Sequence, residues 1–501
     1  MPDYMKLQNG SDIRGVAIAV EGGKPVDLTE EAVRAIGSAF ALWLRKRLGE
    51  NAKRVSIGRD SRLSGEALAA WLAQGLQAAG LDVTDFGLCT TPAMFMSTVM
   101  EGQKYDGAVM ITASHLPFER NGFKFFTAQG GLEKQDIAEI LAGAGTGDLP
   151  TGGAGLYARD NFLPTYAAML RDKIREATGM ERPLAGLRIL VDAGNGAGGF
   201  FAGEVLMLLG ADVTGSQFLE PDGRFPNHAP NPENAAAMVS IRKAVLDNKA
   251  DFGVIFDTDV DRAGAVLKDG SELNRNRLIA ILAAILLREH PGTTIVTDSI
   301  TSTGLAAFIA AHGGVHRRFK RGYRNVINEA QRLCAAGQDA QMAIETSGHG
   351  ALKENYFLDD GAYLMVKLLI ELARAKQEGR TLEALIADLK EPVEGMEFRM
   401  PLTAPDFVAY GNEVIAALTE YAAAQPGWQL ADPNFEGVRV NIDPAHGDGW
   451  FLLRLSLHDP LMPMNIESDM PGGVKQIAAA LTGFLSRFPG LDISSLTAYA
   501  E

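Results

Sequence analysis

Residues 54–86 read RVSIGRDSRLSGEALAAWLAQGLQAAGLDVTDF. Arg54–Gly58 has the character of a short strand, and Val83–Phe86 is a second run of this kind. Between them, Gly65–Ala79 repeats apolar side chains at the spacing of an amphipathic helix. Strand, helix, strand at this spacing is typical of a βαβ unit. The stretch therefore predicts an α/β fold in which helices cover a mostly parallel sheet.

The same order of segments returns twice further along the chain. The repeated segments are Arg188–Asp192, Gly198–Leu209 and Asp212–Thr214, then Thr294–Asp298, Thr301–His312 and Val315–Phe319. After Pro392 the pattern changes to Phe407–Ala424 as a helix, Val438–Ile442 and Trp450–Leu455 as strands, and Val474–Arg487 as a closing helix. We expect three related α/β domains with mixed, mostly parallel sheets, plus a smaller C-terminal α+β domain, around a central cleft.

Domain boundaries follow from breaks in this pattern. Gly143–Gly155 is rich in glycine and small residues, and His290-Pro-Gly292 interrupts the chain before the third unit. The expected domains are 1–160, 161–290, 291–393 and 394–501.

Charge and composition exclude several classes of protein. The 501 residues carry a formal net charge of −15, which argues against nucleic acid or an anionic membrane as partner. Two cysteines, Cys89 and Cys334, are too few for a disulfide framework or a cysteine-based zinc site. No apolar run approaches the ~18 residues of a membrane span, and Met1–Gly10 lacks the apolar core of a signal peptide. We therefore expect a cytoplasmic protein.

Ser114 directly follows the apolar run Gly107–Ile111, which is typical of a buried parallel strand. In open α/β sheets, ligands bind outside the carboxyl ends of the strands. A serine after a strand can also be the cap of the next helix. Here the residues that follow predict a loop, with Leu116-Pro117 and then Asn121-Gly122. His115 and Lys124 lie close by in sequence, and either could assist proton transfer or bind phosphate, although a lone lysine or histidine is more often a surface residue.

A second strand-like run, Phe252–Phe256, ends in three alternating carboxylates, Asp257, Asp259 and Asp261. Alternate residues of an extended segment point the same way, so these side chains can converge. Oxygen ligands at that density suit Mg²⁺, whereas the alternative is a solvated acidic loop. Arg262 cannot be a ligand, but its guanidinium could hold a phosphate. A hydroxyl and a carboxylate cluster at two strand ends suggest metal-assisted phosphoryl transfer.

These segments resemble motifs of the α-D-phosphohexomutases, the phosphoglucomutase/phosphomannomutase-like family. Thr112-Ala-Ser-His115, followed by Asn121-Gly-Phe-Lys124, is similar to the family's phosphoserine signature, and Asp257–Arg262 is similar to its Mg²⁺ loop. Further matches are Gly10-Ser-Asp-Ile-Arg-Gly15, which contains Arg14, Thr90-Thr-Pro92 and Pro221-Asp-Gly-Arg-Phe-Pro226. The motifs occur in family order over essentially the whole chain.

The resemblance implies a Mg²⁺-dependent interconversion of hexose 1-phosphate and hexose 6-phosphate, with glucose or mannose as the sugar. Phosphorylated Ser114 would give its phosphoryl group to the substrate, and a sugar 1,6-bisphosphate would be the intermediate or activator. The metal ligands would be Ser114 and the three aspartates, and the catalytic residues Ser114, His115, Lys124, Arg262 and Arg14. The four domains would carry, in chain order, the phosphoserine, the metal loop, sugar recognition and phosphate binding. Its substrate would be a hexose phosphate, and the enzyme a monomer or homodimer.

Glu345-Thr-Ser-Gly-His349 resembles the family's sugar-recognition loop, although an ordinary polar turn is the alternative and Ile344 replaces the usual glycine. By the same resemblance the substrate-binding residues are Glu345, Ser347, His349, His228, Arg321, Arg454, Ser456 and His458. Arg321 belongs to the basic segment His316–Arg324, which could equally be a solvated strand edge, and a structural loop histidine is the alternative for His228.

The C-terminal phosphate loop departs from the family. The chain reads Arg454-Leu-Ser-Leu-His-Asp-Pro460, with His458 in place of threonine and Pro463 where a second arginine is expected. Proline offers no counterpart to the bidentate arginine fork. If the distal phosphate is bound differently, two alternative functions are possible. One is a glucose 1,6-bisphosphate synthase that uses a sugar bisphosphate donor, and the other is a non-catalytic sugar-phosphate sensor.

Overall fold

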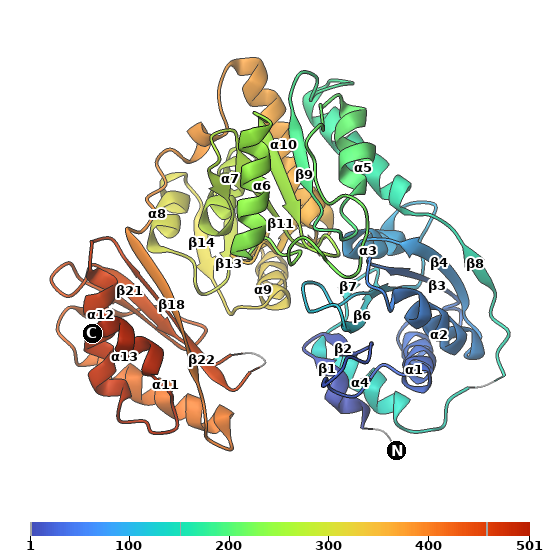
Figure 1. Ribbon diagram of the computed structural model, residues 1–501, viewed down its shortest axis with the longest axis horizontal. Coiled ribbons are helices and arrows are strands. Elements are labelled where there is room, and N and C mark those ends of the chain that lie inside the picture. The colour runs from blue at the N-terminus through green and yellow to red at the C-terminus, as the bar shows by residue number, and fades with distance from the viewer. Residues whose placement is uncertain (1–2, 151, 457–458) are drawn as a thin grey trace. The chain divides into compact units, whose positions relative to one another are not determined.

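The computed structural model describes residues 3–150, 152–456 and 459–501. The chain forms two compact units, of which the first is Met1–Ile285 with Ser347–Leu385 and the second is Leu286–Thr346 with Ile386–Glu501. Helix α7 (Arg275–Glu289) begins in the first and ends in the second. Each unit is built of sheets covered by helices (Figure 1).

The first unit opens with an eight-stranded sheet in the order β1-β2-β6-β5-β3-β4-β8, with β7 paired to β6. β5, β3, β4 and β8 run parallel, whereas β1, β2, β6 and β5 pair antiparallel. The bounds are β1 Gln8–Asn9, β2 Asp12–Val16, β3 Arg54–Arg59, β4 Asp82–Leu88, β5 Gly107–Ile111, β6 Arg120–Thr127, β7 Gly130–Gly131 and β8 Tyr157–Arg159. The strands predicted around residues 54–86 are confirmed.

The helices of this part are η1 Tyr4–Leu7, α1 Glu30–Leu48, α2 Gly65–Ala78, α3 Thr91–Val99 and α4 Lys134–Ala144. α1 begins at Thr29, whose hydroxyl accepts a hydrogen bond from the Ala32 amide at 3.3 Å. α1 and α2 cross closely because Gly75 has no side chain, since a Cβ there would lie 2.2 Å from the Arg34 carbonyl oxygen.

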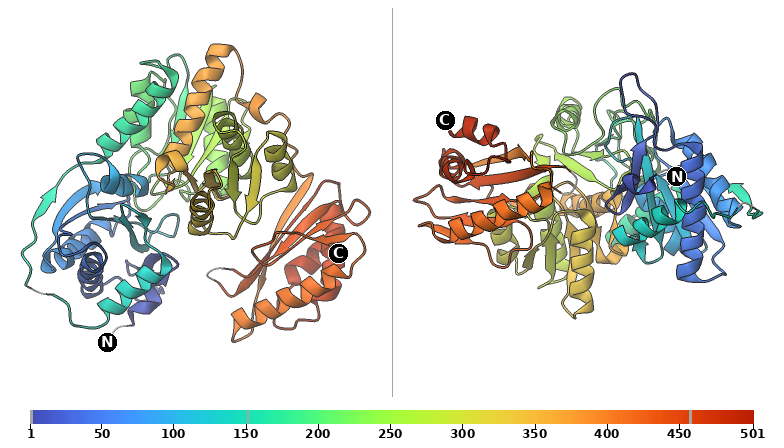
Figure 2. Two further views of the ribbon diagram at one scale, coloured as in Figure 1. Left: turned by 180° about the vertical axis from the view of Figure 1, so that it is seen from behind. Right: turned by 90° about the horizontal axis from the view of Figure 1, so that it is seen from below.

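A second sheet of the first unit has the order β12-β11-β10-β9, in which β9 and β10 are parallel. Helix α10 packs against α5, as the view from behind in Figure 2 shows. The bounds are α5 Leu163–Thr178, β9 Ile189–Asp192, η2 Phe201–Leu206, η3 Met207–Leu209, α6 Ala235–Asp247, β10 Phe252–Phe256, β11 Ala263–Leu267, β12 Glu272–Leu273, β16 Gly350–Leu352, η4 Lys353–Asn355, β17 Leu358–Asp359, α10 Gly361–Glu378 and η5 Glu383–Ile386.

The second unit contains the parallel strands β14, β13 and β15 and a five-stranded antiparallel sheet in the order β18-β22-β21-β20-β19. α11, α12 and α13 close one hydrophobic core with the antiparallel sheet. The bounds are β13 Thr294–Thr297, α8 Thr303–Ala311, β14 Val315–Arg318, α9 Tyr323–Ala335, β15 Ala340–Ile344, β18 Glu394–Pro401, α11 Phe407–Ala423, β19 Trp428–Leu430, β20 Val438–Ile442, β21 Gly449–Leu453, β22 Leu461–Ser468, α12 Gly473–Leu485 and α13 Ser494–Ala500. The predicted α/β class with a further C-terminal sheet domain is confirmed.

Three local predictions are wrong or differ in detail. Asp212–Thr214 is not a strand, because the Asp212 carboxylate accepts the Thr214 amide at 2.9 Å and turns the chain after a single bridge to Arg188. Within Gly198–Leu209 the helical segment is a short π-helix followed by a 3₁₀ turn instead of a regular α-helix. Asn121-Gly122, expected in a loop, lies in β6, where it pairs with β2.

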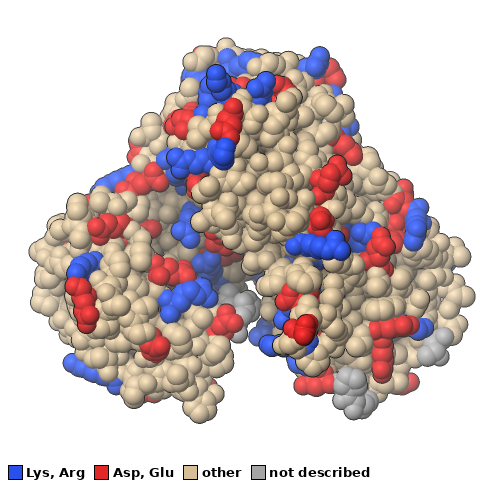
Figure 3. Space-filling model, in the orientation of Figure 1, with Lys and Arg blue, Asp and Glu red and all other residues tan. Residues whose placement is uncertain are grey.

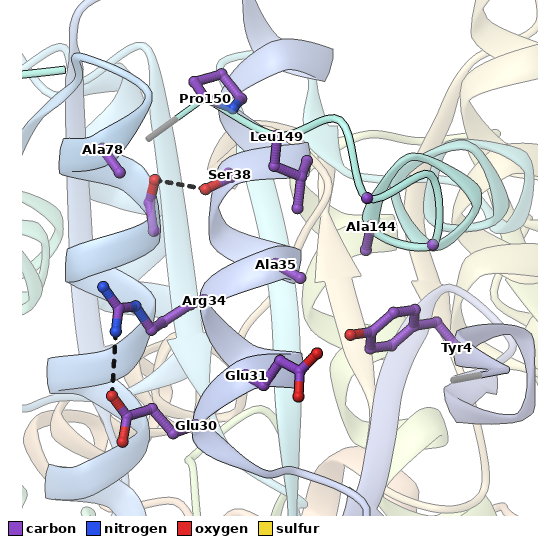
Figure 4. Close-up of a pocket in the computed structure, with 13 residues that line it drawn as sticks. Tyr4, Glu30, Glu31, Arg34, Ala35, Ser38, Ala78, Ala144, Leu149 and Pro150 are labelled. Atoms are coloured by element: carbon purple, nitrogen blue, oxygen red, sulfur yellow. Dashed lines mark hydrogen bonds and ion pairs between the residues drawn. The ribbon is translucent and has the colours of Figure 1, made fainter. Parts of the chain in front are cut away.

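A groove of about 630 Å³ runs along α1, lined by Tyr4, Ala78, Ala144 and Leu149 among others (Figure 4). Two carboxylates, Glu30 and Glu31, stand at its rim, and the guanidinium of Arg34 already pairs with Glu30 at 3.2 Å. An apolar groove with an acidic rim does not suit a phosphorylated ligand.

Acidic and basic side chains form small interspersed groups on the face drawn in Figure 3. Among the described helices, we find none with the length and apolar character needed to cross a membrane.

Candidate active site

Ser114 lies just beyond the carboxyl end of β5, at the edge of the first sheet where β3 and β4 also end. Its backbone is left-handed, with φ 49°, an uncommon conformation for a non-glycine residue. The Ser114 amide donates to the Thr112 hydroxyl at 2.8 Å. The side chain is 7% exposed, so its hydroxyl is held at one place in a nearly buried site.

The Ser114 hydroxyl contacts three groups of the first unit. It donates to Asp257 Oδ2 at 2.9 Å and accepts from Arg262 Nη2 at 2.8 Å. His115 Nδ1 lies 3.3 Å away and also contacts Arg262 Nη2, at 2.6 Å. Burial, and then the Arg262 cation, lower the pKa of His115 to about 3, so this imidazole is neutral at physiological pH. The structure thus brings together Ser114, His115, Arg262 and the first aspartate, as the sequence predicted.

Asp257, Asp259 and Asp261 follow β10, and all three are completely buried. One carboxylate oxygen from each lies within 4.8 Å of the others. Burial, and the charges of the other two aspartates, raise the pKa of Asp257 well above its ordinary value. Three buried carboxylates at this separation require positive charge.

Two oxygen atoms of this triad, Oδ1 of Asp259 and Oδ1 of Asp261, are buried without a hydrogen-bond partner among the described residues. Buried polar atoms are rarely left unpaired in native proteins. Oxygen atoms of this kind, gathered at one point, fit a hard divalent cation. The residues present therefore suit the metal that the sequence pattern predicts.

Lys124 and Arg14 supply positive charge from the neighbouring strands β6 and β2. Lys124 Nζ lies 2.8 Å from Asp261 Oδ2 and 3.8 Å from Asp12 Oδ2, and the Arg14 guanidinium pairs with Asp12 at 2.8 Å. Although burial acts in the opposite direction, Lys124 and the other nearby cations hold the pKa of Asp261 below its ordinary value. The second Arg14 nitrogen donates to the Thr112 carbonyl, next to the serine turn.

His349, predicted to bind the sugar, lies beside the metal loop. Its Nδ1 is 2.5 Å from Asp359 Oδ2 and 3.8 Å from Asp261 Oδ1. The charges of Asp359 and Asp261 outweigh burial and raise the pKa of His349 to about 9. Sequence reasoning missed Asp359, which follows no motif and meets His349 only because β16 and β17 pair in the fold.

His228 is engaged by the protein. Its Nε2 lies 3.0 Å from both carboxylate oxygens of buried Asp192, its Nδ1 contacts the Ala229 carbonyl at 3.0 Å, and its ring meets Phe218 edge-on. Hydrogen bonds to Asp192 raise the pKa of His228 in spite of burial. These contacts leave neither ring nitrogen directed at Ser114.

The boundary between the two units falls inside the predicted sugar loop, so Ser347 belongs to the first unit and Glu345 to the second. Glu345 follows β15, is buried, and accepts the Gly322 amide at 2.6 Å. Arg321 precedes that glycine, and its amide donates to Glu436 at 3.1 Å. The structure therefore places Glu345 next to the basic segment around Arg321.

Arg454 and Ser456 lie in the second unit, just after β21, whereas His458 lies outside the described residues. The Arg454 side chain is 6% exposed, and burial lowers its pKa. Pro463 lies in β22, between β18 and β21, where its carbonyl accepts the Arg454 amide at 3.2 Å. The proline thus supports the strand pairing and offers no cationic group.

Sequence reasoning missed buried Arg439 in this unit, which lies near Arg318 of the basic segment His316–Arg324. Arg439 is 3% exposed, stacks 3.6 Å from the centre of the Trp450 ring, and donates to the Ser299 carbonyl at 2.8 Å. Arg318 donates to the Ser302 carbonyl at 2.7 Å. Burial, together with the repulsion from Arg318, lowers the pKa of Arg439 well below its ordinary value, and burial lowers that of Arg318 to about 10.

Comparison with known proteins identifies the family. Three family models, described as Phosphoglucomutase/phosphomannomutase, alpha/beta/alpha domains I, II and III, match residues 5–148, 165–270 and 274–393. A phosphomannomutase/phosphoglucomutase of Pseudomonas syringae pv. tomato is 32% identical, with 96% of each chain covered. A phosphoglucosamine mutase of Saccharopolyspora erythraea is 33% identical, covering 94% of this chain and 97% of its own.

Among solved structures, a phosphoglucomutase/phosphomannomutase family protein from Burkholderia thailandensis superimposes with a TM-score of 0.81 at 28% identity, covering 98% of this chain and 99% of its own. The domain models, the relatives above 30% identity and the shared fold agree over nearly the full length. The chain therefore belongs to the α-D-phosphohexomutase family and is a phosphohexomutase of the phosphoglucomutase/phosphomannomutase type.

Proposed function

We propose that this enzyme is a Mg²⁺-dependent mutase that interconverts hexose 1-phosphate and hexose 6-phosphate, with glucose or mannose as the sugar and Ser114 as the phosphoryl carrier. One observation carries the proposal. The Ser114 hydroxyl lies 2.9 Å from Asp257, in a buried acidic triad that keeps two oxygen atoms unpaired among the described residues. We place the enzyme in the cytoplasm, as a monomer or homodimer.

In the forward half-reaction, a hydroxyl of the hexose monophosphate attacks the phosphorus of phosphorylated Ser114. The bond from phosphorus to Ser114 Oγ breaks, a bond to the sugar oxygen forms, and the hydroxyl proton leaves to a protein base. The product is a sugar 1,6-bisphosphate. After this intermediate reorients in the site, its other phosphoryl group is transferred to Ser114 Oγ, which restores the phosphorylated serine.

Asp257, Asp259 and Asp261 would hold Mg²⁺ together with an oxygen of the Ser114 phosphoryl group, and the ion would neutralise charge on that group. Arg262, whose Nη2 lies 2.8 Å from Ser114 Oγ and 3.2 Å from Asp257 Oδ2, holds the serine oxygen in place beside that carboxylate. Arg14 ties the strand β2 to the serine turn through the Thr112 carbonyl.

Lys124 is the proton donor in this scheme. Asp261 and Asp12 hold its ammonium group, which would protonate Ser114 Oγ as the bond to phosphorus breaks. His115 has a different task. Its neutral imidazole meets both Ser114 and Arg262, and so orients the two groups that face the phosphorus.

The sugar hydroxyls would be recognised by Glu345, Ser347 and His349, because paired donors and acceptors discriminate hydroxyl orientation. The distal phosphate would be bound by Arg321, Arg454 and Ser456, together with His458 of the same loop. For His228, the contacts with Asp192 support a role in shaping the metal-binding domain.

A second candidate, glucose 1,6-bisphosphate synthase, is favoured by Pro463 in β22. A looser hold on the distal phosphate would let the bisphosphate leave as product. Supplying fructose 1,6-bisphosphate with glucose 6-phosphate distinguishes the two, since a synthase accumulates glucose 1,6-bisphosphate, whereas a mutase turns over hexose phosphate without accumulating it. The third reading, a non-catalytic sensor, requires binding without turnover.

The experiment that tests the carrier role is Ser114→Ala, with Ser38→Ala as matched control. Ser38 is equally small and buried, but its hydroxyl donates to the Gly75 carbonyl between α1 and α2. We expect Ser114→Ala to abolish both turnover and ³²P labelling of the protein by hexose 1,6-bisphosphate, while Ser38→Ala keeps both. Full turnover by Ser114→Ala would exclude the proposed function, and sugar-phosphate binding by an inert wild type would identify a sensor.

A further inference from the structure

Arg62, in the loop between β3 and α2, has a buried guanidinium that reaches across to the loop that follows Ser114. The side chain is 2% exposed. Its terminal nitrogens donate to three carbonyl oxygens of that loop, those of Ser114, Leu116 (2.6 Å) and Pro117 (2.8 Å), and to that of Arg120 (3.0 Å), the first residue of β6. One cation thus holds the loop at several points between the serine and the start of β6.

Residues 114–119 belong to no strand or helix, so their carbonyl groups lack the partners that a ladder would supply. Hydrogen bonds from a charged donor are about twice as strong as neutral ones, and a guanidinium presents five donors in a fixed fork. Lysine cannot reproduce this arrangement, because its three donors radiate from a single atom.

Asp60 completes the arrangement from the same loop. It is wholly buried, accepts the Arg62 amide at 2.9 Å, and lies 3.3 Å from the Arg62 guanidinium. The Thr112 hydroxyl donates to Asp60 at 2.7 Å and in turn accepts the Ser114 amide. The Ser114 backbone is therefore held on both sides, its amide through Thr112 and its carbonyl by Arg62.

Such support has a purpose at this residue. A left-handed backbone costs an L-residue about 1 kcal/mol or more, and it persists where the surroundings over-determine it. Ser114 has φ 49°, and this turn directs its hydroxyl to Asp257 and Arg262.

Phe225 covers Arg62 from the other side. It belongs to the Pro221–Pro226 motif of the second sheet domain, and its ring centre lies 5.2 Å from the guanidinium carbon. Gly223 of the same motif sits so close to the Arg62 loop that a Cβ would come within 2.5 Å of Leu63 N and Ser61 O. The motif excludes water from the cation, and electrostatic interactions strengthen where water is excluded.

We propose that Arg62 is a positioning residue for phosphoryl transfer. Backed by Asp60 and covered by Phe225, it fixes the loop that carries Ser114, so that its replacement slows transfer while leaving hexose phosphate binding unchanged. The inference rests on the proposed carrier role of Ser114.

The main test is Arg62→Lys, with Arg59→Lys as matched control. Arg59 lies three residues earlier and pairs with exposed Glu66 at 2.7 Å. A displacement of about 1 Å at a reacting atom costs about 10²-fold in rate. We expect kcat to fall about 10²-fold in Arg62→Lys, with KM unchanged and Tm within a few degrees of wild type. Arg59→Lys should keep wild-type kcat. Equal kcat in the two variants, or a rise in KM alone, would overturn the proposal.

A second pair of variants serves if Arg62→Lys does not fold. Phe225→Leu removes the aromatic cover, whereas Phe118→Leu changes an exposed phenylalanine, 38% exposed, in the serine loop itself. We expect a loss of about tenfold in kcat for Phe225→Leu, which is half of the change in barrier given above for Arg62→Lys, and none for Phe118→Leu. A larger loss of kcat in Phe118→Leu than in Phe225→Leu would contradict the role of the Phe225 ring over Arg62.

Amide hydrogen exchange of the peptide 112–120 separates this inference from the proposed function. Exchange should be faster in Arg62→Lys than in wild type and unchanged in Arg59→Lys, whatever reaction the enzyme catalyses. Unchanged exchange would refute the positioning role even if Ser114→Ala is inactive. Fast exchange with full activity of Ser114→Ala would refute the carrier role alone.

Discussion

Each unit buries a cluster of charge, and the two clusters are unbalanced in opposite directions. In the first unit, the buried aspartates after β10 keep two oxygen atoms unpaired among the described residues. In the second, buried Arg439 and Arg454 keep guanidinium nitrogens without a hydrogen-bond partner there. Burial raises the pKa of Asp257 in one cluster and lowers that of Arg439 in the other.

Burying a charge without a partner is costly, so an unbalanced cluster indicates a ligand of opposite charge. We therefore propose that the first cluster binds a cation and the second an anion. A phosphohexomutase needs both, a metal at the phosphoryl group in transfer and a hold on the phosphate that stays. Each cluster can be tested separately.

The largest effect is expected for Asp259→Asn. Losing a ligand of the metal removes several kcal/mol of charge stabilisation, so turnover should fall about 10³-fold, measured as conversion of hexose 1-phosphate to hexose 6-phosphate at saturating Mg²⁺. Asp247→Asn, at an exposed position of α6, is the control and should match wild type. Wild-type turnover by Asp259→Asn would show that the triad does not serve the reaction.

Glu467→Gln tests the cluster of buried arginines in the second unit through the pH dependence of the protein's stability. Burial raises the pKa of Glu467 to about 7 from 4.5, in spite of its hydrogen bond from Trp450 and the charge of Arg439. Because the folded pKa is higher than the unfolded one, the stabilising contribution is complete below pH 4.5 and is lost as the pH rises to about 7. The loss amounts to about 3 kcal/mol.

The glutamine variant lacks this loss. Its Tm should therefore be close to wild type at pH 5 and above it at pH 8, whereas Glu413→Gln, exposed on α11, should show the same difference at both values. A variant that is less stable than wild type at pH 8 would mean that Glu467 balances the arginines as a charged partner.

A smaller effect is expected for Arg454→Ala. A hydrogen bond to a charged group contributes about 2 kcal/mol, so KM for hexose phosphate should rise about 30-fold with a lesser change in kcat. The control Arg487→Ala removes an arginine at the end of α12 that stacks on Phe484. If KM does not change, the distal phosphate is held by groups other than Arg454.

The smallest effect is the response of wild-type stability to the metal. A ligand that binds only the folded state raises Tm, and we expect about 2–4 °C on addition of millimolar Mg²⁺. Asp259→Asn should lose the shift and Arg454→Ala should keep it. A shift that survives in Asp259→Asn would place the cation outside the triad.

The sequence predicted most of the first cluster because its members stand in short motifs at strand ends. Ser114 follows a buried strand, and the three aspartates alternate in one segment. Ser114 and Asp257 are 143 residues apart along the chain, and their meeting was expected from the position of ligands at the carboxyl ends of strands and from the family resemblance. The fold class followed from repeated strand, helix, strand segments. Local patterning was insufficient where a side chain redirects the backbone, as the Asp212 carboxylate does.

Residues that act from a distance in sequence were missed. Asp359 reaches His349 through the pairing of β16 and β17, and Arg62 reaches the serine loop from the loop between β3 and α2. Arg439 looks like an ordinary strand residue until the Trp450 ring covers it. In each case, burial converts a common residue type into a strongly interacting one, and no spacing rule signals burial between distant segments.

The left-handed backbone at Ser114 restricts which amino acids evolution can place there. Threonine also carries a hydroxyl and is phosphorylated in many proteins, and a single nucleotide change can convert a serine codon into a threonine codon. A β-branched side chain at φ 49°, however, is a genuine outlier on steric grounds. The turn thus makes the shortest mutational route from serine to another hydroxyl residue costly, so that backbone geometry favours serine at position 114.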